Sequence, residues 1–471
     1  MRLFINCIIA MFIAIMPCFA YDIATPSIIG DNMVVNRHSS AKIWGWDKAG
    51  KKVAIVASWN PTDTVRVMCD SNSRFEADIA TPGAGGPYTI EIMGTGKKRV
   101  IRNVMSGEVW LCGGQSNMQM SMSSLFGTKV DYKAEFAKID NPNIRTFFVP
   151  LKASSSPQED CGGEWNECHA DIMGDVSLAA YFFAERLQSE LGVPVGIVMS
   201  SWGGTNAEVW VSEEAAATNG DVELSAKAMA PKTWKPIKTA SLYNSMINPL
   251  VPFRFSGALW YQGESNVVDP RYYDSSMRTL IDCWRSDFGT DMPFYFAQIA
   301  PYDYKGESLN KSAYLREQQL LTSTYENCGM IVINDLVHDY KNIHPKDKRS
   351  VGYRFAEMAM GRLYGVEGTN CVYPTVESVE IKGNKAILKI SESVKQISKE
   401  QSGFKIAGRD GNFVDAQIKI KGDMITVSAK GVSKPQYVRY LFDDGSTCAI
   451  KGAESELPLT PFRNDTIEVS K

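Results

Sequence analysis

The chain has 471 residues, of which 44% are hydrophobic and 22% are charged, and its formal net charge at pH 7 is -3. This length exceeds what one small hydrophobic core requires, so we expect more than one domain. The net charge is slightly negative, whereas proteins that bind nucleic acid usually carry an excess of basic residues. Nucleic acid is therefore not expected as a partner.

Residues 1–20 have the pattern of a secretory signal peptide. Arg2 supplies a positive charge, residues 3–16 are almost wholly apolar, and Ala20 ends the segment with the small residue that signal peptidase requires. This apolar run is shorter than the roughly twenty residues that span a bilayer, and no lipobox precedes a cysteine there. We therefore predict a periplasmic or secreted chain, beginning near Tyr21, with no membrane anchor.

Residues 21–105 are predicted to form an N-terminal β-domain. Short β-rich runs at residues 41–46, 52–58 and 88–93 are separated by Gly, Asp and Pro, and no helical stripe of apolar residues is present. This pattern is typical of small antiparallel sheets.

Residues 106–366 are predicted to form an α/β domain with a parallel sheet. Continuous apolar strands alternate with amphipathic helices, which indicates strands covered on both faces. The predicted strands are 108–112, 195–200, 255–261, 294–299 and 329–334, and the predicted helices are 178–191, 272–288, 314–325 and 350–363. From residue 367 to residue 471 apolar and polar residues alternate again, which predicts a C-terminal β-module.

The first strand of the α/β domain ends in Gly113-Gly114-Gln115-Ser116. Ligands of parallel sheets gather beyond the carboxyl ends of the strands, and a glycine turn there can display a serine nucleophile. The next strands end near Gly203-Gly204 and near Gln262. Main-chain N–H groups and a side-chain amide are the donors of an oxyanion hole, if these loops converge on Ser116.

A serine nucleophile needs a base, and the chain has four histidines, His38, His169, His338 and His344. His38 lies in the predicted β-domain and His169 is remote from any strand end, so both are expected to be structural or exposed. His338 and His344 remain as candidates. Pro345 fixes the backbone after His344 and would hold its imidazole in one orientation.

Four motifs in this order resemble those of the sialate O-acetylesterase family, within the SGNH hydrolase superfamily. They are Gly114-Gln115-Ser116-Asn117-Met118, Trp202-Gly203-Gly204-Thr205, the segment 260–266, and the segment 343–348 with 351–354. The resemblance implies a flavodoxin-like hydrolase core, serine esterase chemistry without metal or cofactor, and O-acetylated carbohydrate as substrate, foremost O-acetylated sialic acids. It also implies that Ser116 is the nucleophile, that His344 is the base, and that Gly203, Gly204 and Gln262 line the oxyanion hole.

The chain departs from the superfamily at one position. The superfamily places an aspartate three residues before the catalytic histidine, where this chain has Lys341. The literal spacing occurs instead between Asp335 and His338, but we favour His344 because the residues around it match the family. Asp335 is then the first candidate for the acid that orients His344. Asp339 and a Ser-His dyad with a backbone carbonyl are the alternatives.

Two other functions fit the same sequence features. An acetyl-xylan or other polysaccharide deacetylase would use the same machinery, and flanking β-modules also suit a glycan-binding protein with an inactive core. The aromatic side chains of Trp202, Trp210 and Tyr261 are candidates for a sugar platform, although aromatic residues beside strand ends more often pack in the core. Glu264 is expected to be a buried residue that orients neighbouring loops.

Eight cysteines remain after residue 20, an even number in a compartment that permits disulfides. Cys161 and Cys168 flank a Gly-Gly loop and are predicted to form a local disulfide. No Cys-x-x-Cys spacing is present, so the sequence gives little support to a structural zinc site.

Overall fold

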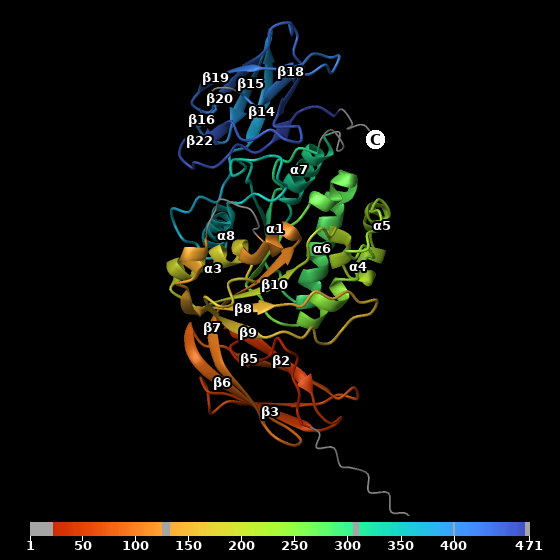
Figure 1. The fold of residues 1–471 in the computed structure, drawn as a ribbon, viewed down its shortest axis with the longest axis vertical. Coiled ribbons are helices and arrows are strands. Elements are labelled where there is room, and N and C mark those ends of the chain that lie inside the picture. Colours follow the sequence, from red (N-terminus) through yellow and green to blue (C-terminus); the bar gives the residue numbers. More distant parts are fainter. Residues whose placement is uncertain (1–21, 125–131, 305–309, 399–400, 467–471) are drawn as a thin grey trace, which may run out of the picture.

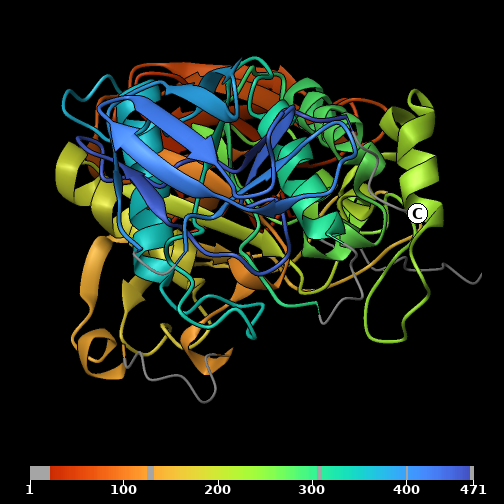
Figure 2. The same ribbon diagram turned by 90° about the horizontal axis from the view of Figure 1, so that it is seen from above.

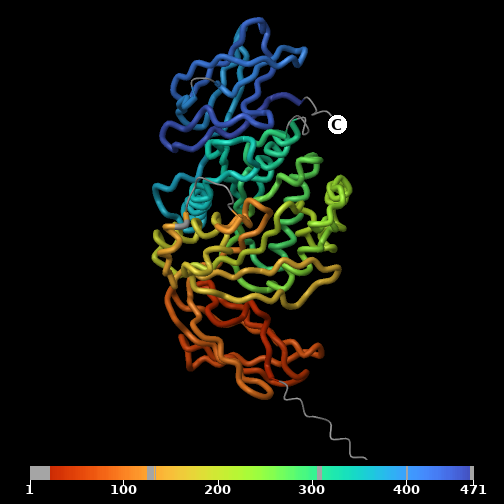
Figure 3. Tube along the Cα trace, in the orientation of Figure 1, coloured from red at the N-terminus to blue at the C-terminus, as the bar shows by residue number. Residues whose placement is uncertain are grey.

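The computed structural model describes residues 22–124, 132–304, 310–398 and 401–466, so the predicted signal peptide lies outside the described residues. Figures 1 and 3 show three parts stacked along the longest axis. N-terminal strands lie at one end, a mixed α/β part lies in the middle, and C-terminal strands lie at the other end. No helix in the described residues has the length and apolar character needed to cross a membrane.

The N-terminal part is built mainly from antiparallel strands, whereas its first strand, β1, pairs in parallel with residues 105–107. β2 pairs with β5, and β3 pairs with both β4 and β6. Alternate side chains of β5, including Phe75 and Ile79, are buried, as period-two patterning predicts. The strands are β1 (Val34–Asn36), β2 (Ser40–Trp46), β3 (Lys52–Ala57), β4 (Thr64–Met68), β5 (Arg74–Ala80) and β6 (Gly85–Met93).

Strand β7 (Arg99–Gly114) joins this part to the middle of the molecule. Its first half pairs antiparallel with β6, and its second half pairs parallel with β10 and β11. One continuous strand therefore belongs to both sheets, and the predicted domain boundary at residue 105 falls within it. Because a strand is stiff, the N-terminal part is fixed relative to the strand end that carries Ser116.

The central sheet has the strand order β13-β12-β11-β7-β10-β8-β9. All neighbours in this order are parallel except β8 and β9, which confirms the predicted α/β core with a parallel sheet. The strands beyond β7 are β8 (Asp140–Phe148), β9 (Trp165–His169), β10 (Val195–Ser201), β11 (Gly257–Tyr261), β12 (Phe294–Ala297) and β13 (Cys328–Ile331). Our sequence analysis missed β8 and β9, because polar residues interrupt their apolar pattern.

Helices flank this sheet, with α3 and α8 on one side of the molecule and α6 on the other (Figures 1 and 2). α3 and α8 pack so closely that a Cβ on Gly352 would lie 2.6 Å from the Ala179 carbonyl oxygen. The longer helices are α3 (Leu178–Leu191), α6 (Tyr273–Phe288), α7 (Lys311–Thr322) and α8 (Lys348–Arg362). The shorter ones are α1 (Ser116–Gln119), α2 (Lys133–Phe136), α4 (Glu213–Ala217) and α5 (Gly220–Lys227).

The C-terminal part has its own core, which includes Leu388, Ile406, Ile425 and Val438. Its sheets have the orders β14-β15-β20-β19 and β18-β17-β21-β23, with β16 paired to β22. The strands are β14 (Val376–Lys382), β15 (Lys385–Ile390), β16 (Val394–Gln396), β17 (Phe404–Ala407), β18 (Val414–Asp415), β19 (Gln417–Lys421), β20 (Met424–Ser428), β21 (Tyr437–Tyr440), β22 (Ile450–Gly452) and β23 (Phe462–Arg463).

Every cysteine in the described residues is a free thiol, so the predicted disulfide between Cys161 and Cys168 is wrong in this structure. Cys168 is buried with its sulfur 3.4 Å from the sulfur of Met173, whereas the Cys161 thiol donates to the Gly162 carbonyl. The two side chains are therefore engaged with different neighbours.

The turn after β7 gives a test of this packing. Gly114 has φ +133°, and a Cβ there would lie 2.3 Å from the Tyr261 carbonyl oxygen. Gly192 also has positive φ but has open space around it. We expect Gly192→Ala to cost about 1 kcal/mol of stability from backbone strain, and Gly114→Ala about 3 kcal/mol or more from strain plus overpacking. Thermal unfolding of both variants measures the difference, and equal losses would contradict this account.

Candidate active site

Ser116 is displayed at the carboxyl end of β7 by two glycines that the packing requires. A Cβ on Gly113 would lie 3.0 Å from the Trp260 ring, and Gly114 faces the Tyr261 backbone of the adjacent strand β11. Side chains at either position would push the two strands apart. The chain therefore turns sharply after β7, and helix α1 begins at Ser116.

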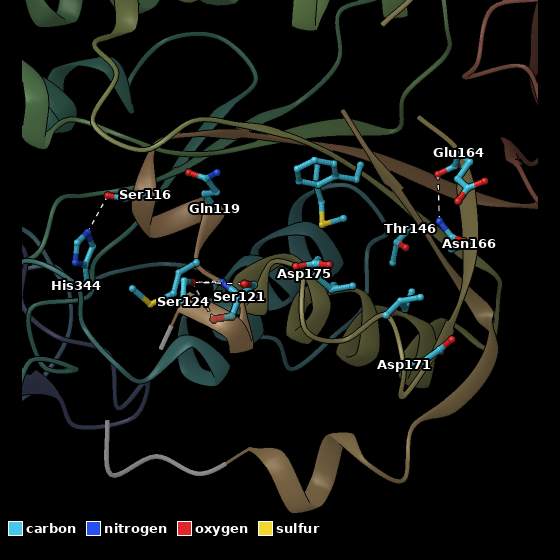
Figure 4. Close-up of a pocket in the computed structure, with 15 residues that line it drawn as sticks. Ser116, Gln119, Ser121, Ser124, Thr146, Glu164, Asn166, Asp171, Asp175 and His344 are labelled. Atoms are coloured by element: carbon cyan, nitrogen blue, oxygen red, sulfur yellow. Dashed lines mark hydrogen bonds between the residues drawn. The ribbon is translucent and has the colours of Figure 1, made fainter. Parts of the chain in front are cut away.

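The structure brings Ser116 and His344 together. His344 Nε2 lies 2.9 Å from Ser116 Oγ, and the dashed line in Figure 4 marks this contact. The other histidines lie elsewhere: His338 is exposed, His169 contacts two surface carboxylates, and His38 lies beside Gly83 in the N-terminal part. A serine hydroxyl in contact with an imidazole nitrogen is the arrangement that nucleophilic catalysis requires.

Asp335 does not orient His344, which corrects our prediction for this residue. Its carboxylate accepts hydrogen bonds from both terminal nitrogens of Arg354, each at 2.7 Å, and lies 2.7 Å from Lys451 Nζ. Burial alone would raise the pKa of Asp335, but the hydrogen bonds and charges of Arg354 and Lys451 outweigh it and lower the pKa. Both oxygens of the Asp335 carboxylate therefore belong to an ion-pair network that extends to Lys451 of the C-terminal part.

Asp339 is also engaged elsewhere, because it is exposed and accepts the Lys341 main-chain N–H at 3.0 Å. Among the residues that the structure describes, no carboxylate hydrogen-bonds to the His344 ring. The main-chain N–H of His344 is donated to Asn342 Oδ1 at 3.0 Å. The histidine is therefore held through its backbone, with no acid on its ring.

Three buried polar residues, Asn117, Glu264 and Lys348, hold the loops around this pair, and we call them the polar cluster. The Asn117 amide nitrogen donates to Glu264 Oε1 at 2.5 Å and to the Ile343 carbonyl at 3.1 Å. Lys348 Nζ donates to Asn117 Oδ1 at 2.6 Å. The cluster ties the residue after Ser116 to the residue before His344, and it agrees with the expected role of Glu264 in orienting loops.

Burial and charge tune the titration of these groups. Burial lowers the pKa of Lys348 to about 7 and raises the pKa of Glu264. Burial also lowers the pKa of His344, and the positive charge of Lys348 lowers it further. The imidazole is therefore neutral at pH 7 and can accept a proton from Ser116.

Gln262 does not face Ser116, contrary to the predicted oxyanion hole. It is fully buried, and its amide nitrogen donates to Asn266 Oδ1 at 2.8 Å and to the Thr205 carbonyl at 3.1 Å. Its amide oxygen accepts the Tyr273 hydroxyl at 2.9 Å. Gln262 therefore joins the loops after β10 and β11 internally, and it has no donor left for a ligand.

The two glycines differ in their relation to Ser116. A Cβ on Gly203 would lie 3.3 Å from Ser116 Cβ, and the Gly203 N–H donates to Gln119 Oε1 at 2.7 Å. The carbonyl of Gly204 accepts hydrogen bonds from Lys235 and Ser265. Gly203 is thus the donor nearer to Ser116. The sequence analysis did not identify Gln119, which accepts the Gly203 N–H in this structure. Gln119 lies three residues after Ser116 on the same helix, and this spacing would have indicated that both side chains share one helix face.

Ser116 and His344 lie between two hollows. The larger one has a volume of 740 Å³ and contains the carboxylates of Glu164, Asp171 and Asp175; we call it the acidic hollow (Figure 4). Neither lysine nor arginine is among the described residues that line it.

The smaller hollow has a volume of 500 Å³ and contains Trp202 and Trp234; we call it the aromatic hollow. Trp202 is half-buried there, as the sugar-platform prediction allows. Trp210 and Tyr261 are fully buried, which agrees with the core packing favoured for them and excludes them from a sugar platform. Sequence analysis missed Trp234, because no strand end lies near it.

Comparisons with known proteins agree on a carbohydrate esterase. Residues 106–361 match the family described as carbohydrate esterase, sialic acid-specific acetylesterase. Human sialate O-acetylesterase is 26% identical over 419 residues, covering 81% of this chain and 79% of the human protein. The mouse sialate O-acetylesterase is 27% identical over 424 residues, covering 78% of each. The crystal structure of a carbohydrate acetylesterase from Xanthomonas citri superposes with a TM-score of 0.84 at 30% identity, covering 95% of this chain and 100% of that chain.

The pKa of His344 gives a test of the polar cluster. Because His344 titrates below its ordinary value of 6.5, Lys348 is still protonated over that range and repels the imidazolium. Removing this charge with Lys348→Met should therefore raise the pKa of His344. NMR titration of the imidazole measures this pKa. The control Lys341→Met removes an exposed lysine from the same loop and should leave the pKa of His344 unchanged. Equal effects of both variants on this pKa would contradict the role of the polar cluster.

Proposed function

The chain belongs to the sialic acid-specific acetylesterase family of carbohydrate esterases, and from this premise we propose that Ser116 is its nucleophile and His344 its general base. The protein is a carboxylic ester hydrolase that acts on O-acetylated carbohydrate. The observation that carries the proposal is the 2.9 Å contact between His344 Nε2 and Ser116 Oγ.

In the proposed reaction, His344 Nε2 takes the hydroxyl proton of Ser116 while Oγ attacks the acetyl carbonyl carbon. Collapse of the tetrahedral intermediate breaks the bond to the sugar oxygen, which receives the proton from His344. Water then attacks the acetyl-serine with the same proton transfers and releases acetate.

The oxyanion of this intermediate needs N–H donors close to Ser116. We assign this role to the main-chain N–H groups of Ser116 and Gly203. The Gly203 N–H is satisfied by Gln119 Oε1 in this structure, so the Gln119 side chain has to release it when substrate binds.

We propose a Ser-His dyad in place of a full triad. Asp335 and Asp339 are engaged elsewhere, and the backbone contacts of Ile343 and His344 hold the imidazole. The lowered pKa of His344 keeps the base neutral without a carboxylate partner.

For the substrate we infer an O-acetylated sialic acid, because the human and mouse relatives are sialate O-acetylesterases. A neutral O-acetylated polysaccharide such as acetyl-xylan is the second candidate. It is favoured by the acidic hollow, since the carboxylates of Glu164, Asp171 and Asp175 repel the carboxylate of a sialic acid. The pattern of residues 1–20 further supports a periplasmic or secreted enzyme.

Ser116→Ala and His344→Ala should each lower kcat for hydrolysis of 4-nitrophenyl acetate by about a thousandfold or more. Both residues take part in the same proton transfer, so the loss of either one prevents it. His338→Ala is the matched control, since it removes an exposed histidine of the same region, and it should retain activity. A wild-type protein without esterase activity would instead support a glycan-binding protein with an inactive core.

Acetate release from O-acetylated sialic acid and from acetylated xylan decides between the substrates, and we expect the higher kcat/KM on the sialic acid. Asp175→Asn removes one negative charge from the acidic hollow, so it should lower KM for the sialic acid and change KM for xylan less. A preference for xylan would establish the second candidate.

A further inference from the structure

Trp234 is a large aromatic side chain that the fold leaves in solvent beside the catalytic pair. It is 60% exposed, whereas the other tryptophans of the described residues are buried or half-buried. It lines the aromatic hollow together with Ser116, His344 and Trp202. Single exposed apolar side chains are common on protein surfaces, so the place of this ring beside Ser116 and His344, and not its exposure alone, points to a ligand.

The Trp234 ring is also held in position. A Cβ on Gly204 would lie 2.4 Å from the ring, so the indole rests directly on the backbone of the loop after β10. Lys235 Nζ donates to the Gly204 carbonyl at 2.6 Å and lies 5.4 Å from the centre of the Trp234 ring. A rigid aromatic face costs little conformational entropy when a ligand binds to it.

The chemistry of the hollow suits a sugar ring. A pyranose has an apolar C–H face, which packs on an aromatic ring, and polar hydroxyls at its rim. Gln119 and Ser265 line the same hollow and offer hydrogen-bonding groups for those hydroxyls.

The position of the hollow indicates which sugar ring binds there. The acidic and aromatic hollows share Ser116, Gln119 and His344, so the nucleophile lies between them. A glycan with its acetylated residue in the acidic hollow has room for the next residue in the aromatic hollow. A free monosaccharide leaves one of the two empty.

We propose that Trp234, with Trp202, forms a subsite for the sugar that neighbours the acetylated residue, so that the enzyme prefers acetylated oligosaccharides to free acetylated monosaccharides. This subsite rests on the proposed esterase function of Ser116 and His344. It applies to a sialic acid linked to its neighbouring sugar and equally to a residue within a polysaccharide.

The test compares hydrolysis of O-acetylated sialyllactose with free O-acetylated sialic acid, and of acetylated xylotriose with acetylated xylose. Within the pair of substrates that the wild-type enzyme hydrolyses, kcat/KM should be about tenfold higher for the oligosaccharide than for the monosaccharide. A tenfold difference corresponds to the binding free energy of about one sugar ring stacked on an aromatic side chain. Trp234→Ala should remove this advantage through KM, with a much smaller loss on the monosaccharide and on 4-nitrophenyl acetate. Trp234→Tyr keeps an aromatic face and should restore most of the advantage.

Leu224→Ala is the control, because Leu224 is 46% exposed on α5 and lines neither hollow. It should keep the oligosaccharide preference. Equal losses on all substrates in Trp234→Ala, or no wild-type preference for the oligosaccharides, would overturn the subsite while leaving the esterase assignment standing. A wild-type enzyme that fails to hydrolyse even 4-nitrophenyl acetate would overturn the proposed function and the subsite with it.

Discussion

The geometry of the Ser116–His344 pair depends on the polar cluster of Asn117, Glu264 and Lys348. Removing charged groups from water costs several kcal/mol for each ion, so a buried lysine and glutamate depend strongly on the hydrogen bonds that they make. Here Asn117 bonds to Lys348 Nζ and to Glu264 Oε1, whereas Glu264 Oε2 has no hydrogen-bond partner among the described residues. The Asn117 amide nitrogen also holds the Ile343 carbonyl. Because Asn117 follows Ser116 and Ile343 precedes His344, the proposed nucleophile and base are held by the same buried asparagine. Movement of either residue breaks hydrogen bonds of buried charges.

This anchor explains how the site is organised without a carboxylate on His344. An orienting aspartate usually fixes the tautomer and direction of the imidazole. In this chain a lysine, Lys341, stands three residues before His344, and the nearby Asp335 carboxylate binds Arg354 of α8 and Lys451 of the C-terminal part. Asp335 therefore connects two parts of the molecule. The orientation of His344 comes from its backbone, and Lys348 contributes a positive charge that keeps the imidazole neutral.

Sequence reasoning found the features that depend on local pattern. The apolar strands, the helices between them, and the glycine turn before Ser116 each follow from residues adjacent in the chain. It failed where distant groups compete for one side chain. Gln262 has the chemistry of an oxyanion donor and follows a strand end in the sequence, but Tyr273, Thr205 and Asn266 use its hydrogen-bonding groups. Neither that competition nor the exposure of Trp234 has a periodic signature.

The two hollows differ in chemistry, and the size of the charge repulsion in the acidic hollow decides how strongly it selects a substrate. The carboxylates of Asp171 and Asp175 are exposed, so their repulsion of a sugar carboxylate is screened and amounts to about 1 kcal/mol or less per pair. A penalty of this size changes an affinity by about fivefold, so the acidic hollow weakens the binding of a sialic acid without excluding it. A neutral sugar meets no such penalty. The acidic hollow therefore selects between the two substrates only modestly.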